Sequence, residues 1–357
     1  MIMKGRDCMN YYEKLNLAIK NSITDRNLEY QLKYFDEIAK LAEIIVENTP
    51  DLERQSYNVE VPIEESIEMT TDFFKSIKKE YSEMFLNILQ EKNYDTKNDY
   101  SVKFHPGDGK NKSEVRKDGT VDIDYFSTLE DVFTITHEIT HKFSQPKNQN
   151  STIKEFLGET STISMEFLLE DYLINNSYYD KNEISIYKNN RLHETVDDAG
   201  AILFERELLK LYQKSNGNLT QDVLLDYLNY MNKDSKLYAL FFERGEKYLN
   251  SIVRTGTLSF PQRERYVIGT MLASDFHSKI KEDSSEVQKL SYLIDVLGHS
   301  DITSSTDLKT LERVGIPIIK DGEIKVTDET ISNLTTCYEK EVISCESYKD
   351  SKVSKSM

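Results

Sequence analysis

Apolar residues recur with a helical period along most of the chain. Between residues 28 and 46, and again between 67 and 88, they lie three or four positions apart with charged residues between them. That spacing is typical of amphipathic helices. The same period returns over residues 128–281, and the glycine-interrupted segment 290–344 predicts short helices. The pattern therefore predicts a mainly α-helical protein.

One segment departs from the helical period. Residues 101–105 and 120–125 alternate apolar and polar side chains, and the residues 106–110 between them form the turn-rich run Pro-Gly-Asp-Gly-Lys. Alternation of this kind predicts half-buried strands joined by a turn. We expect a small antiparallel β-sheet with an exposed edge.

Charge and cysteine content narrow the functional classes. Lys and Arg number 45 against 62 Asp and Glu, a net charge of −17, which disfavours binding to nucleic acids or to anionic membranes. The three cysteines show no framework spacing. The chain has neither an apolar run of membrane-spanning length nor a signal-peptide pattern near its start. These features predict a cytoplasmic protein.

One helical segment carries candidate chemistry. His137 and His141 are four residues apart in the sequence HEITH, which places both imidazoles on the same face of a helix, where they can reach one ion. Glu138 can then face a water molecule on that ion. Val132 and Ile139 fall on the opposite, packing side. The alternative reading is a pair of surface histidines on a charged helix.

A catalytic zinc site usually has three protein ligands and an open position for water. No cysteine lies near the motif, and the next histidine downstream is His193. The following helical stretch offers Glu155, Glu159 and Glu166, and the last two share a helix face because they are seven residues apart. Spacing alone leaves all three open as the third ligand.

Two runs resemble those of oligopeptidase F, a zinc metallopeptidase of the thimet oligopeptidase family. They are residues 126–138, FSTLEDVFTITHE, and residues 158–169, GETSTISMEFLL. The likeness covers roughly residues 100–345. It implies a helical zinc peptidase in which His137, His141 and Glu159 bind zinc, Glu138 is the general base, and Glu166 supports a ligand from outside the coordination sphere.

The chain also departs from that family. Late in the chain, the family has a histidine and several tyrosines that polarise the scissile carbonyl. Here the corresponding region, residues 258–266, has one tyrosine, Tyr266, and no histidine. Tyr266 is the candidate carbonyl donor, with Arg263 and Arg265 as rivals.

We expect three regions: a short helical N-terminal region (1–95), a catalytic region with the HExxH zinc site (96–345) and a polar tail (346–357). The expected activity is zinc-dependent hydrolysis of oligopeptides, with the strand edge at 121–125 pairing with the substrate backbone. Peptides are the expected partner, rather than nucleic acids or membranes. Two alternatives are a peptidase specialised for one leader or signalling peptide and a non-catalytic zinc-containing relative that binds peptides.

Overall fold

The computed structural model describes residues 6–24, 34–51, 53–57, 59–90, 101–110, 112–144, 152–299, 311–312, 314–320 and 323–353. Its elements are, in chain order, α1 (Arg6–Thr24), α3 (Phe35–Asn48), α4 (Ile63–Ile77), α5 (Lys79–Gln90), β1 (Val102–Pro106), β2 (Glu114–Val115), β3 (Val121–Tyr125), α6 (Leu129–Ser144), α7 (Thr152–Asn175), α8 (Lys181–Lys214), α9 (Gln221–Tyr230), α10 (Lys236–Thr255), α11 (Phe260–Glu282), the 3₁₀ helix η1 (Ser284–Glu286), α12 (Val287–His299), β4 (Ile319–Lys320), β5 (Glu323–Ile324) and α14 (Asp328–Val353). The mainly α-helical prediction is confirmed.

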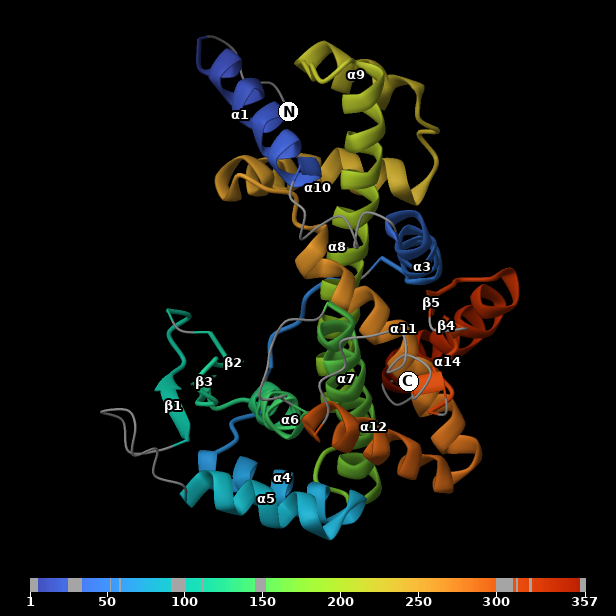
Figure 1. The fold of residues 1–357 in the computed structure, drawn as a ribbon. Helices are drawn as coiled ribbons and strands as arrows, with labels where there is room; N and C mark the ends of the chain where they lie inside the picture. The colour runs from blue at the N-terminus through green and yellow to red at the C-terminus, as the bar shows by residue number, and fades with distance from the viewer. Residues whose placement is uncertain are drawn as a thin grey trace.

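Helices α7 and α8 form the central column of the molecule (Figure 1). Helix α11 packs along both of them, and α3 packs against α8. Helices α1, α9 and α10 lie at one end of the column, while α4 and α5 lie at the other. The small sheet stands to one side, next to α6, and α6 packs against α7. Helix α6 therefore lies between the sheet and the column.

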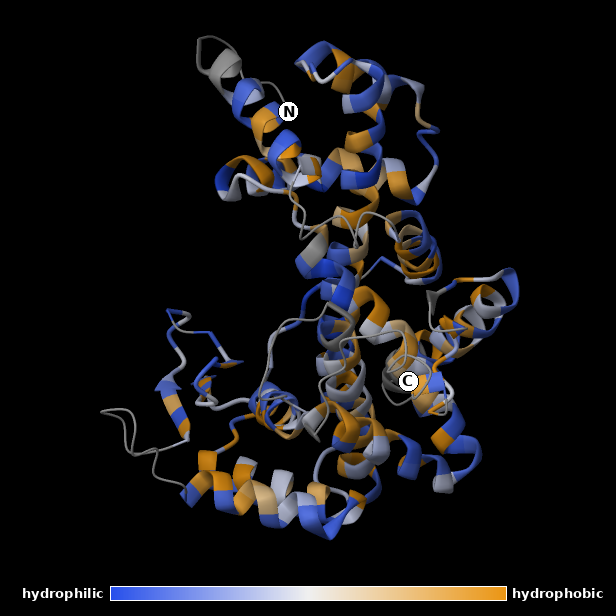
Figure 2. Cartoon of the chain, viewed as in Figure 1, coloured by the Kyte–Doolittle hydropathy of each residue, from blue (hydrophilic) through white to orange (hydrophobic). Residues whose placement is uncertain are grey.

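The predicted helical stripes are buried in this arrangement. In α3, Ile38, Leu41 and Ile45 are each at most 3% exposed. The predicted helix at 28–46 begins at Phe35 in the described chain, and residues 28 and 32 lie outside the described ranges. The stripe at 67–88 is divided between two helices, because the extended backbone of Lys78 ends α4. Along these outer helices hydrophobic and hydrophilic residues alternate (Figure 2).

The prediction of an antiparallel sheet is wrong. The strand order is β1-β3-β2; β1 runs parallel to β3, and only β2 pairs with β3 in the antiparallel sense. The turn at 106–110 therefore does not close a hairpin, because the chain first forms β2 and then crosses to bring β3 between β1 and β2. Strand β3 is the central strand, so its edge is not the exposed one that the sequence suggested.

In the described C-terminal residues, the last helix is longer than predicted. After α12 the chain forms the two-stranded antiparallel sheet β4-β5 and then the long helix α14. Side-chain contacts hold α14 against the rest of the protein: the buried Tyr338 hydroxyl lies 2.6 Å from the hydroxyl of Thr49. In addition, Glu341 accepts a hydrogen bond of 2.7 Å from Lys188 of α8. Such long-range polar contacts leave no local signal in a sequence.

The expected region boundaries can be compared with the structure only in part. The boundary at 95/96 lies within residues 91–100, outside the described ranges. Helix α14 continues to Val353, into the expected polar tail, whose last four positions are not described. Within the described residues, no helix combines the length and the apolar character needed to cross a bilayer.

Candidate metal centre and catalytic cavity

Helix α6 begins directly after the strand that ends at Tyr125. Asp131, in its first turn, accepts hydrogen bonds from the backbone N–H groups of Phe126 (3.1 Å) and Thr128 (2.7 Å), which fixes the entry into the helix. Val132 and Ile139 are fully buried on the packing face, as predicted. The opposite face carries His137 and His141, whose side chains are 15% and 24% exposed. The helix therefore has the separate packing and ligand faces that a metal site needs.

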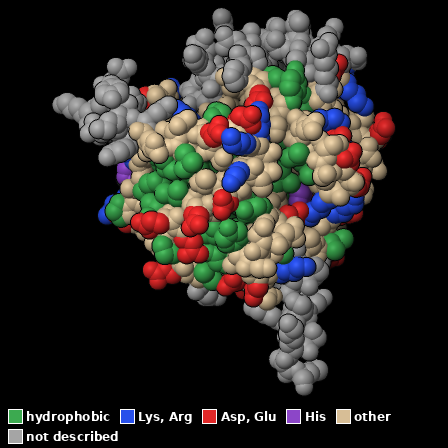
Figure 3. Space-filling model, turned by 90° about the horizontal axis from the view of Figure 1, so that it is seen from below, with side chains coloured by type: hydrophobic (Ala, Val, Ile, Leu, Met, Phe, Trp, Pro, Cys, Tyr) green, Lys and Arg blue, Asp and Glu red, His purple; other side chains and the backbone are tan. Residues whose placement is uncertain are grey.

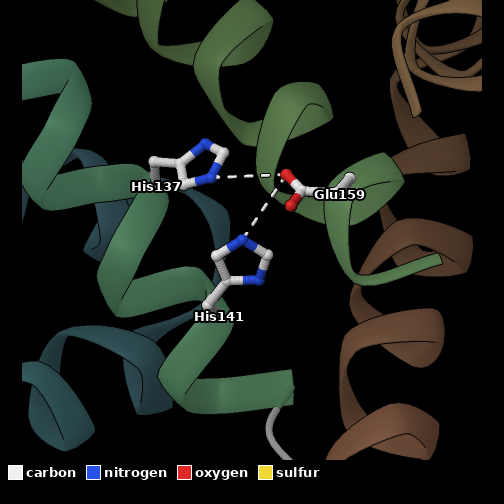
Figure 4. Close-up of side chains that lie close together, drawn as sticks. All are labelled: His137, His141 and Glu159. Atoms are coloured by element: carbon white, nitrogen blue, oxygen red, sulfur yellow. Dashed lines mark ion pairs between the residues drawn. The ribbon is translucent and has the colours of Figure 1, made fainter. Parts of the chain in front are cut away.

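Three side chains from α6 and α7 converge on one point (Figure 4). One carboxylate oxygen of Glu159, Oε2, lies 3.4 Å from Nε2 of His137 and 3.5 Å from Nε2 of His141. The three potential ligand atoms all lie within 4.8 Å of one another. Glu159 is 2% exposed, and its Oε2 has no hydrogen-bond partner.

The two separations from Glu159 fit a tetrahedral metal ion. With metal–ligand distances of about 2.0–2.2 Å and tetrahedral angles, two ligand atoms lie about 3.4 Å apart. The measured separations of 3.4 and 3.5 Å agree with that value. A buried carboxylate oxygen without a hydrogen bond is costly unless a cation meets it. Two imidazoles and one carboxylate are a ligand set that zinc accepts, with a fourth position left for water.

Glu166 holds the first histidine in place. Its Oε1 lies 2.5 Å from Nδ1 of His137, which leaves Nε2 to face Glu159. Its Oε2 accepts a hydrogen bond of 2.8 Å from the Tyr187 hydroxyl and lies 3.3 Å from Nε of Arg191. Burial opposes ionisation of Glu166, but Arg191 and His137 hold its pKa below the usual value. A carboxylate on the far nitrogen of a metal-binding histidine commonly orients the ring.

The structure separates the three carboxylates that spacing left open. Glu155 is exposed and lies outside the cluster of ligand atoms. Glu166 contacts the outer nitrogen of His137, so it lies behind that ring. Glu159 alone of the three belongs to the cluster with both histidines. Its second oxygen, Oε1, lies 3.4 Å from Nε of Arg265.

His137 of the cluster lines a cavity of about 780 Å³. His137, Glu138 and Tyr266 line it together, so the structure brings the expected general base and the expected carbonyl donor to the same space. Glu138 is 8% exposed, and burial raises its pKa, while the neighbouring histidines act in the opposite direction. Seen from below, the molecular surface carries acidic, basic and hydrophobic side chains side by side (Figure 3).

Comparison with known proteins gives one structural match. No family model matches the sequence, and neither does any curated protein. The fold is similar to that of a crystal structure from Chlamydophila abortus described as a "putative peptidase", with a TM-score of 0.54 and 18% sequence identity. The alignment covers 97% of this chain and 56% of that one, so this chain spans little more than half of its structural relative. The similarity shows a shared fold.

The late-chain candidates occupy different positions around the cavity. The Tyr266 hydroxyl accepts a hydrogen bond of 3.0 Å from Nη2 of Arg265, whose guanidinium carbon lies 4.8 Å from the centre of the tyrosine ring. Arg263 is paired with Asp198, at 2.5 Å. Burial, followed by the charge of Glu159, raises the pKa of Tyr266 to about 12, so the phenol keeps its proton at neutral pH.

Sequence reasoning missed Tyr187 and Arg191, which fix Glu166 from α8. They are four residues apart, so both point to the same side of the helix. That spacing is a weak signal of a functional role, because any two residues four positions apart on a helix share a face. Only the packing of α8 beside α7 gives the two residues their role.

A glycine allows α11 to approach α7 at the ligand itself. A Cβ atom on Gly269 would lie 2.9 Å from Cβ of Glu159 and 3.2 Å from its backbone carbonyl carbon. Contacts this short force one helix to move. A Cβ on Gly158, by contrast, would meet the His141 ring at an ordinary 3.6 Å.

We therefore expect Gly269→Ala to lower the free energy of unfolding by roughly 1–3 kcal/mol, the usual cost of overpacking. It should also weaken any metal binding at the candidate centre, because the displaced helix carries Glu159. Gly158→Ala is the matched control: alanine fits there, and its helix propensity exceeds that of glycine. Urea denaturation and elemental analysis of both variants provide the measurement. Equal stability and zinc content in the two would contradict the close approach.

Proposed function

We propose that this chain is a zinc-dependent metallopeptidase that hydrolyses peptide bonds in oligopeptides. The observation that carries the proposal is the convergence of His137, His141 and Glu159 on one point, with His137 and Glu138 lining the adjacent cavity. The fold shared with the Chlamydophila abortus protein described as a "putative peptidase" supports it. The motif resemblance to oligopeptidase F supports the same reading and favours peptides over folded proteins as substrates.

Bound zinc would polarise the scissile carbonyl and lower the pKa of its water ligand toward neutrality. Glu138 accepts the proton of the attacking water and delivers it to the leaving amine. Its burial suits this role, because a carboxylate with a raised pKa is a stronger base toward the attacking water. Glu166 keeps the His137 ring oriented during both transfers.

Tyr266 supplies the hydrogen bond to the carbonyl oxygen. Because Arg265 donates to the phenolic oxygen, the Tyr266 proton is free to point toward another acceptor. The neighbouring guanidinium also makes the hydroxyl a stronger donor. A fixed donor aimed at developing negative charge is typically worth about 10²–10³-fold in turnover.

Strand β2, rather than β3, offers an edge for the substrate backbone. Strand β3 has neighbours on both sides, while β2 lies at the edge of the sheet. Glu114 of β2 lies near enough to Glu138 to raise its pKa, and Ser113, just before β2, lines the cavity. An extended peptide added to β2 would therefore pass beside the general base.

A digest of a peptide library tests the proposal. The zinc-loaded protein should cleave peptides, as detected by mass spectrometry, and a chelator should abolish cleavage until zinc is restored. Cleavage of only a single sequence class would favour the specialised processing peptidase. Zinc binding and peptide binding without any cleavage would favour the non-catalytic relative and overturn the proposal.

The donor assignment makes a separate prediction. Tyr266→Phe should lower kcat by about 10²–10³-fold and leave KM near the wild-type value, because the hydrogen bond strengthens only as negative charge develops. Arg263→Ala serves as the comparison, and a raised KM confined to it would indicate recognition of the substrate carboxylate. Wild-type kcat in Tyr266→Phe would remove this residue from the site.

A further inference from the structure

The basic residues that line the catalytic cavity are all paired. Each of the four has a carboxylate partner that lines the same cavity: Arg54 pairs with Glu194, Arg191 with Glu166 (3.3 Å), Lys247 with Asp197 (2.8 Å) and Arg263 with Asp198 (2.5 Å). The positive charges of the wall are therefore balanced within the protein. They do not create a general attraction for anionic substrates.

Four further carboxylates line the cavity without such a partner. They are Glu138, which serves as the base in the proposed mechanism, and Asp124, Glu130 and Asp131. Among the described residues, the ion pairs within 4.0 Å include none of these four. The wall formed by the end of β3 and the first turn of α6 thus carries carboxylates without a close ion-pair partner, next to the candidate metal centre.

Asp124 is a buried carboxylate on this wall that has no role in the proposed mechanism. It is 6% exposed, and its Oδ2 accepts a hydrogen bond of 3.1 Å from the backbone N–H of Gly109. Its Oδ1 is buried and has no hydrogen-bond partner. Both oxygens of Asp131 instead cap the start of α6. A buried carboxylate oxygen of this kind costs free energy until a donor meets it.

Glu130 and two aromatic residues complete the wall. Burial and the neighbouring Asp131 raise the pKa of Glu130, and the opposing effect of Arg54 is smaller. Tyr57 and the 52% exposed Phe126 line the cavity beside it. Carboxylates and aromatic rings together are the surroundings that favour an ammonium or guanidinium group.

We infer that Asp124 and Glu130 form a subsite for a cationic group of the substrate, either a Lys or Arg side chain or a free amino terminus. This inference rests on the proposed peptidase function and adds a substrate class to it. The net charge of −17 would also attract basic peptides at long range, and this attraction should weaken with salt.

Helix α6 sets the distance between this subsite and the candidate metal centre. Glu130 and His137 are seven residues apart on α6, and at 1.5 Å per residue this corresponds to about 10 Å along the axis. An extended peptide covers the same distance in about three residues, at about 3.3 Å each. The cationic group should therefore lie about three residues from the cleaved bond.

Binding to the zinc-loaded Glu138→Gln variant tests the subsite without turnover. Matched octapeptides would carry Lys, norleucine or Glu at one position, with acetylated and free amino termini, and calorimetry would give Kd. We expect the Lys peptide to bind roughly 10-fold more tightly than the norleucine peptide at low salt, the scale of one charge-assisted hydrogen bond. Tighter binding of the free-terminus peptides than of the acetylated ones, with equal affinity for Lys and norleucine, would assign the subsite to the amino terminus.

Two charge-neutralising variants locate the effect. Asp124→Asn and Glu130→Gln, each added to Glu138→Gln, should remove most of the preference for the cationic peptide. Asp226→Asn, which removes the same charge from exposed α9, should keep it. Glu130→Gln keeps the test decisive if Asp124→Asn fails to fold. Equal affinity for the Lys and norleucine peptides, together with equal affinity for the acetylated and free-terminus peptides, overturns the subsite, and it does so whether or not the wild-type protein cleaves peptides.

Discussion

Glu138→Gln should bind zinc as the wild-type protein does and hydrolyse peptides at least roughly 100-fold more slowly, the usual scale for loss of a general base. Glutamine keeps the size of the side chain and its place in the cavity but cannot accept the water proton. The proposed ligand atoms belong to other residues, so this substitution removes none of them. Elemental analysis and single-peptide kinetics on the same preparation measure both quantities.

The paired measurement makes this prediction informative. A variant that loses both zinc and activity would indicate that Glu138 contributes to the metal centre itself. Undiminished cleavage with zinc bound would exclude Glu138 as the base, and another group in the cavity would have to take the proton.

Removal of a ligand should have the second large effect. His141→Ala and Glu159→Gln should each lose most of the bound zinc, because two remaining protein ligands rarely hold the ion. Glu166→Gln should weaken zinc binding less, by roughly 10–100-fold, since it acts through the His137 ring. Competition with a chromogenic chelator gives the affinities.

Glu155→Gln is the control for this series. It lies one turn before Glu159 on the same helix, is exposed and is absent from the ligand cluster. It should bind zinc with wild-type affinity. Wild-type zinc content in His141→Ala, or a larger loss in Glu155→Gln than in Glu159→Gln, would refute the ligand assignment.

Features set by neighbouring residues could be predicted from the sequence. The spacing of His137 and His141 fixes their common face through helix geometry alone, and the apolar residues Val132 and Ile139 fix the packing face. The third ligand was less certain, because Glu155, Glu159 and Glu166 lie on one helix. Which carboxylate meets the histidines depends on how α7 crosses α6, and spacing carries no information about that crossing.

Features set by distant parts of the chain could not be predicted. Alternation identified the strands at 102–106 and 121–125, but strand direction depends on the crossing through β2, whose two residues are too few to show a pattern. Arg191 was missed for a similar reason, since its partner Glu166 lies on another helix. The long α14 is fixed by contacts such as that between Lys188 and Glu341.

All three proposed metal ligands fall within residues 137–159, on two helices that follow each other in the chain. The ion would therefore close a short loop, and so remove little chain entropy from the unfolded state. Its contribution to folding would arise from mass action instead: free zinc at 100 times Kd adds about 2.7 kcal/mol to the stability of a protein that binds it only when folded. The extensive apolar core around α7, α8 and α11 does not depend on the ion. Thermal stability should thus follow the free zinc concentration, with a folded apo state at the lower limit.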